Sequence, residues 1–142
     1  MHLRFWPTLV VGITLASVGC SKPARDEALN EELRDRALLQ LRSIGAAYRT
    51  MSARGNPPEN ADQLQHQLSG DDALLKSPRD GHHYVVVWRV NLPALTTAAK
   101  STLLAWEKLA DPSGHRCVLW ANGETGYLAA DEFQSARKAK GK

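Results

Sequence analysis

The chain has 142 residues, of which 43% are hydrophobic and 23% charged, and its formal net charge is +3. This length fits one domain with a single core and excludes a large multidomain enzyme. The charge is too small for a nucleic-acid-binding surface, and four of the positive charges lie in the last six residues. Those residues, 137–142, are expected to form a disordered basic tail.

The first twenty residues have the layout of a secretory signal. Arg4 precedes an uncharged run, residues 5–18, and Gly19 and Cys20 follow it. A basic start, an apolar run and small residues before a cleavage site are typical of a signal peptide. The run has 14 residues, whereas a helix needs about 20 to cross a bilayer. A removed signal is therefore favoured over a permanent transmembrane helix.

The residues Ser17-Val18-Gly19-Cys20 resemble the bacterial lipobox. The resemblance implies a signal peptide of residues 1–19 and two or three acyl chains, palmitate among them, on Cys20, which would hold the chain stably to a lipid bilayer. The alternative is a plain secretory signal that is cut nearby. In lipoproteins of this kind, an aspartate directly after the lipidated cysteine retains the protein in the inner membrane. Ser21 is at that position here, so the resemblance implies the periplasmic face of the outer membrane. A lipidated Cys20 leaves Cys117 without a disulfide partner.

After a short polar tether, residues 20–26, the sequence predicts a long amphipathic helix from about Arg25 to Ala53. Charged residues occupy one side of this helix, and Gly55 with Pro57-Pro58 ends it. Apolar residues recur on the other side at spacings of three and four, namely Leu29, Leu33, Ala37, Leu41, Ile44, Tyr48 and Met51.

The remaining chain predicts one more helix and then strands. Asn60 is the expected cap of a short second helix, and turns are expected at Ser77–Gly81 and Asp111–Gly114. Asn122-Gly123 predicts a hairpin with a two-residue type I′ turn. Strands are expected at residues 84–90, 102–107, 115–120 and 125–128, a connecting loop at 91–100, and a short helix or helical turn at 130–137.

This order of elements predicts an α+β fold. A long N-terminal amphipathic helix should pack on a three- to four-stranded antiparallel sheet, within one domain of residues 27–136. The hairpin register should place Cys117 and Leu119 on one face of the sheet and Val118 and Trp120 on the other.

The order resembles the globular part of type IV pilin-like proteins, the pseudopilins of type II secretion systems in particular. The resemblance covers roughly Leu33 to Phe133 and implies the fold, with a helix packed on a sheet. The resemblance does not imply filament assembly. Pilins keep an apolar N-terminal helix that builds the filament, whereas here the apolar run is expected to be removed with the signal. The motifs that carry the resemblance are Leu41–Tyr48, Gly55–Pro58, Asp62–Leu64, Ser77–Tyr84 and Leu119–Thr125.

Residues with catalytic or metal-binding chemistry form no recognisable set. His82 and His83 are adjacent, so they would point to opposite faces of a strand. Cys117 is expected to be buried and inert rather than a nucleophile. The sequence therefore predicts no enzyme, no metal and no cofactor.

Three tryptophans remain as candidates for a partner contact: Trp88, Trp106 and Trp120. They lie on consecutive predicted strands, and tryptophan is enriched at binding surfaces. They either anchor the core between sheet and helix, or line an open sheet face. The sequence thus favours a non-catalytic envelope lipoprotein that contacts an unidentified protein, and the resemblance implies a secretion or pilus-like apparatus as the source of that protein. The alternative is a lipoprotein that binds a small ligand between helix and sheet.

Overall fold

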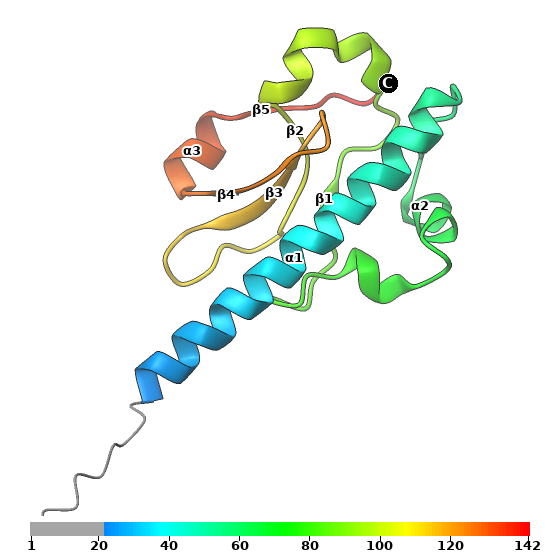
Figure 1. Cartoon of the computed structure of the whole chain (residues 1–142). Helices are drawn as coiled ribbons and strands as arrows, with labels where there is room; N and C mark the ends of the chain where they lie inside the picture. The colour runs from blue at the N-terminus through cyan, green and yellow to red at the C-terminus, as the bar shows by residue number, and fades with distance from the viewer. Residues whose placement is uncertain (1–21) are drawn as a thin grey trace, which may run out of the picture.

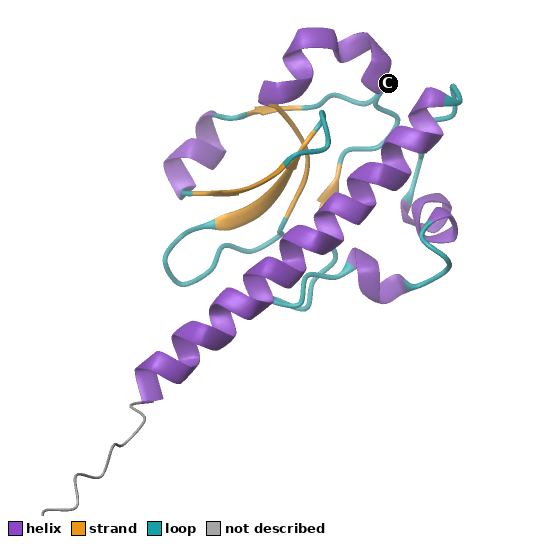
Figure 2. Cartoon of the chain, in the orientation of Figure 1, coloured by secondary structure: helices purple, strands orange, loops and turns teal. Residues whose placement is uncertain are grey.

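The computed structural model describes residues 22–142, so the signal peptide and the lipidation site at Cys20 lie outside the described residues. Three α-helices, two 3₁₀ helices and five strands follow one another along this part of the chain (Figures 1 and 2). They are α1 (Lys22–Ala53), α2 (Ala61–Gln67), η1 (Asp72–Leu75), β1 (Val85–Val86), η2 (Leu92–Ser101), β2 (Thr102–Trp106), β3 (Arg116–Trp120), β4 (Thr125–Leu128), α3 (Ala130–Ser135) and β5 (Arg137–Lys138). None of these helices combines the length and the apolar character needed to span a bilayer.

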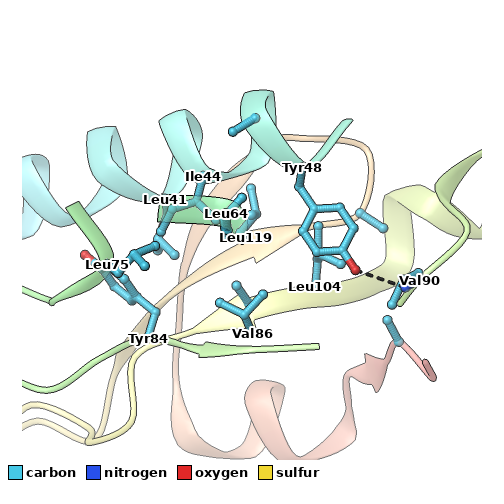
Figure 3. Close-up of a cluster of buried hydrophobic side chains, with 14 of the residues drawn as sticks. Leu41, Ile44, Tyr48, Leu64, Leu75, Tyr84, Val86, Val90, Leu104 and Leu119 are labelled. Atoms are coloured by element: carbon cyan, nitrogen blue, oxygen red, sulfur yellow. Dashed lines mark hydrogen bonds between the residues drawn. The ribbon is translucent and has the colours of Figure 1, made fainter. Parts of the chain in front are cut away.

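The sheet confirms the α+β prediction and adds one strand to it. Strands β1 to β4 are antiparallel neighbours in chain order, and β5 pairs with β2 in parallel. Helix α1 crosses one face of the sheet (Figure 1). The three-layer close-up in Figure 3 shows α1 on one side of the strands and α3 on the other.

The C-terminal half of α1 provides one wall of the core. Leu41, Ile44 and Tyr48 are fully buried there, as their helical spacing predicts. They pack toward Leu104 and Leu119 of the sheet (Figure 3). Burial of such side chains is the main source of stability in a domain of this size.

The N-terminal half of α1 extends beyond the sheet. The helix begins at Lys22, so the predicted tether of residues 20–26 is helical from that residue on. Pro23 is compatible with this start because the first turn of a helix needs no internal N–H donor. Residues 24–32 are all exposed, and Leu29, which the apolar spacing predicts to be buried, is 54% exposed. Figure 1 shows the first turns of α1 reaching past the strands.

Tyr48 fixes the segment that follows β1. Its hydroxyl donates a hydrogen bond to the carbonyl of Val87 at 2.8 Å and accepts one from the backbone N–H of Val90 at 3.0 Å (Figure 3). Burial raises the pKa of Tyr48 to about 12, so the hydroxyl keeps its proton. The strand predicted at residues 84–90 is therefore shorter than expected: β1 covers only two residues, and Arg89 has a positive φ of 59° that turns the chain out of the sheet.

The β3–β4 hairpin is confirmed, but its turn is not of the predicted type. Gly123 N–H donates to the carbonyl of Trp120 at 2.8 Å, and Trp120 N–H donates to that of Glu124, also at 2.8 Å. Gly123 has a φ of 91°, whereas Asn122 does not have a positive φ. This pattern is a three-residue loop that ends in a left-handed glycine, not a two-residue type I′ turn. The register still places Cys117 and Leu119 on the α1 face, as predicted.

Replacing Gly123 should test the left-handed backbone at this loop. We expect Gly123→Ala to lower the free energy of unfolding by about 1–2 kcal/mol, since an L-residue with a Cβ is strained there. Gly123→Asn should cost less, because asparagine tolerates positive φ. Both new Cβ atoms would meet the Arg49 guanidinium, whose carbon lies 2.5 Å from the built position, so that contact cancels in the comparison. Urea denaturation measures the free energy of unfolding of both variants. Equal losses of stability would mean that the contact with Arg49, and not the positive φ, causes the destabilisation.

The prediction of a disordered tail at residues 137–142 is wrong. Arg137 and Lys138 pair with Thr102 and Leu103 of β2, and Ala139 is 9% exposed and donates its N–H to the carbonyl of Leu103 at 2.8 Å. The site for this pairing exists because the chain leaves β2 after Val87, whose backbone N–H still donates to the carbonyl of Leu104 at 2.9 Å, and the start of β2 is then free. Arg137 and Lys138 are therefore held along the edge of the sheet.

Candidate interaction surface

The sheet face opposite α1 carries two of the three candidate tryptophans. Cross-strand pairs place Trp106 beside Val118, and Leu103 beside Trp120. Leu103 and Val118 are 0% exposed, while both indoles are only half-buried. Alternation along β3 explains this, because Cys117 and Leu119 face the core and their neighbours face the other way.

Helix α3 covers part of this face through Phe133. The rings of Phe133 and Trp106 meet edge to face, with centroids 5.8 Å apart and an interplanar angle of 65°. The guanidinium carbon of Arg116 lies 4.7 Å from the Phe133 ring centroid, and Nζ of Lys138 lies 4.6 Å from it. Trp106 is thus held in a small aromatic and cationic cluster.

Trp120 lies instead at an open hollow beside α3. The hollow has a volume of about 500 Å³ and is lined by Lys100, Ser101, Trp120, Leu128, Glu132, Ser135, Ala136 and Arg137. Gly126 on the neighbouring strand leaves room for the indole, since a Cβ built there would lie 3.2 Å from Nε1 of Trp120. An apolar platform that is partly open and ringed by polar groups is typical of a contact surface.

Trp88 does not belong to this surface. It is half-buried and packs against the core cluster on the α1 side of the sheet. The core-anchor interpretation therefore describes Trp88, and the open-face interpretation describes the positions of Trp106 and Trp120. The three candidates do not form one patch.

A buried charged cluster on the α1 side of the sheet was not predicted. Arg79 donates to Glu107 at 2.9 Å and to Asp111 at 2.7 Å, and all three side chains are at most 6% exposed. Glu107 also accepts from the hydroxyl of Ser77 at 2.8 Å and from the backbone N–H of Cys117 at 2.7 Å. The cluster thus fastens the turn at residues 77–81 to the end of β2 and to β3.

The surroundings in this cluster keep Asp111 ionised and the Cys117 thiol protonated. Burial alone would raise the pKa of Asp111, but hydrogen bonds from Tyr127, from the His115 backbone and from Ser113, with the charge of Arg79, lower it below its usual range. Burial, with a contribution from Glu107, raises the pKa of the Cys117 thiol to about 12. A thiol that stays protonated at neutral pH is a poor nucleophile. We interpret the cluster as structural.

Residues 22–142 contain no group of three or more His, Cys, Asp or Glu side chains that could hold a metal ion. His82 and His83 are both exposed, and His83 pairs with Asp72 at 3.0 Å. His115 stacks on Tyr127, with ring centroids 4.8 Å apart. The histidines therefore lie in separate surroundings.

No family model, no curated protein and no solved structure matches the chain.

Proposed function

We propose that the protein is a non-catalytic lipoprotein of the cell envelope that acts through protein–protein contacts. Acylated Cys20 holds it in the membrane, on the periplasmic face of the outer membrane, and the folded domain presents a contact surface. The observation that carries this proposal is the half-buried Trp120 in an open hollow on the face that α1 leaves free. Tryptophans in such positions are often centres of binding energy.

The exposed start of α1 supports the anchoring part of the proposal. Lys22 begins the helix two positions after Cys20, and residues 24–32 are all exposed. A helix in this position is suited to separate the domain from a membrane. The pseudopilin-like order of elements favours a secretion or pilus-like apparatus as the source of the partner.

The alternative of a small ligand bound between helix and sheet has little support. Such a ligand needs space between α1 and the strands, and fully buried side chains occupy that region, among them Leu41, Ile44 and Leu119 (Figure 3). The core around them also contains Leu104 and Tyr48.

The anchor is tested by Cys20→Ser in the full-length protein expressed in a bacterial host. We expect the variant to lose palmitate incorporation and either to leave the membrane fraction or to accumulate as the uncleaved precursor. Cys117→Ala is the matched control, because it removes the other cysteine and should leave both properties unchanged. A Cys20→Ser protein that is processed normally and still fractionates with membranes would contradict the lipoprotein assignment.

A further inference from the structure

The hollow beside α3 carries positive charges that the rest of the domain does not neutralise. Lys100 and Arg137 line it and are both exposed. Neither takes part in a salt bridge within residues 22–142. Glu132, whose carboxylate also accepts a hydrogen bond from the backbone N–H of Ala129 at 3.0 Å, is the one acidic residue among those that line the hollow, against these two cations. The hollow therefore has a surplus of cations.

Strand pairing brings the backbone of both cations close to that of Trp120. Arg137 belongs to β5, whose pairing with β2 places it opposite Thr102, and Lys100 lies two residues before Thr102 in the chain. Trp120 pairs across the sheet with Leu103, the next residue of β2. Trp120, Lys100 and Arg137 thus line one hollow near the start of β2.

We propose that this hollow binds an acidic segment of a partner protein, with an apolar side chain of that segment on Trp120 and its carboxylates on Lys100 and Arg137. The inference rests on the proposed function and names the chemistry of the partner. Complementary charge fixes the orientation of the two partners and raises the association rate, and the Trp120 indole contributes affinity. Strand β5 lies toward the end of the domain away from the first turn of α1, which favours a protein partner over the membrane that holds the anchor (Figure 1).

Binding can be measured by the ¹⁵N–¹H resonance of the Trp120 indole in the full-length protein in detergent, with Trp120→Phe to assign it. The probe is a short synthetic peptide of glutamates around one leucine, and its matched counterpart has lysines in place of the glutamates. We expect the acidic peptide to shift the Trp120 resonance in a saturable way and the basic peptide to leave it unchanged. Equal shifts with both peptides, or none with either, would overturn the inference.

Charge reversal locates the contact without altering the core. Lys100→Glu with Arg137→Glu should weaken binding of the acidic peptide by about tenfold or more, equivalent to about 1.4 kcal/mol for each factor of ten. Lys108→Glu is the control, because Lys108 is exposed and does not line the hollow, so its affinity should stay within about twofold of the wild type. Unchanged affinity in the double variant would show that the peptide binds elsewhere and overturn the inference.

Two further outcomes separate this inference from the proposed function. If an oligogalacturonate shifts the Trp120 resonance and the acidic peptide does not, the hollow takes an anionic glycan and the proposed protein contact there is wrong. If photo-crosslinkers in the anchored protein capture a protein partner from Ser43 on α1 but not from Ser135 in the hollow, protein contact stands and this surface is wrong. Capture from Ser135 that the double charge reversal abolishes would support the inference.

Discussion

Arg79→Met is expected to lower the free energy of unfolding by about 3–5 kcal/mol, because it leaves the buried carboxylate of Glu107 without its charged partner. Glu107 is 1% exposed and Arg79 is 6% exposed, so water cannot replace the lost ion pair. Asp111, which is 5% exposed, loses the same partner. Chemical denaturation of the wild type and the variant at neutral pH measures the difference.

An exposed ion pair in the neighbouring segment supplies the control. Lys76 pairs with Asp72, and their side chains are 44% and 45% exposed. Lys76→Met should therefore cost at most about 1 kcal/mol. Adding Glu107→Gln to Arg79→Met should recover part of the stability, since the unpaired buried charge is then removed. If Arg79→Met costs no more than Lys76→Met, the cluster is not a buried network in solution.

Leu41→Ala is expected to lower the free energy of unfolding by about 2–5 kcal/mol, the usual cost of removing a large buried side chain. Leu41 is 0% exposed and lies where α1 meets the sheet. Its near neighbour Leu39, on the same helix, is 60% exposed, so Leu39→Ala should change stability by less than about 0.5 kcal/mol. The two variants have the same chemistry and nearly the same helix position. A reversed order of the two losses would mean that α1 packs on the sheet through another face.

Local patterns were sufficient to predict most of the fold. The apolar spacing along α1 identified Leu41, Ile44 and Tyr48, and the alternation along β3 placed Cys117 on the core side. Both signals depend on periods of a few residues, which tertiary contacts did not override. Leu29 was predicted to be buried but is exposed, because periodicity identifies a face of a helix and does not show how far the opposing sheet extends.

The pairing of β5 could not be read from its own sequence. Arg137-Lys138 has none of the β-branched or aromatic residues that predict a strand, and its cations indicated a solvated tail. Its position depends on a residue far away in the sequence. At Arg89 the chain turns away from β2, and β5 then pairs with the edge of β2 that is left free. Non-local pairing of this kind leaves no periodic signal.

The candidate surface was predicted by residue type and the charged cluster was missed. Trp120 was a candidate because of its residue type alone, without knowledge of its neighbours. Lys100 and Arg137 are far from it in sequence, and only the folded sheet brings them to the same hollow. Arg79 and Asp111 appeared only as residues of two turns. The one sequence signal of the cluster is Glu107, an acidic residue directly after the apolar β2 strand.

The continuity of α1 has a mechanical consequence for an anchored protein. The same helix is exposed over residues 24–36, apart from partly covered Leu33 and Arg34, and packs into the core from Ala37 onward. This exposed part, residues 24–36, measures about 20 Å at the usual rise per residue. If Cys20 is held in a bilayer, this rod has no hinge between its base and the domain, so the domain cannot swivel independently of it. The direction in which the Trp120 hollow faces would then be set by the tilt and rotation of one helix at the membrane surface.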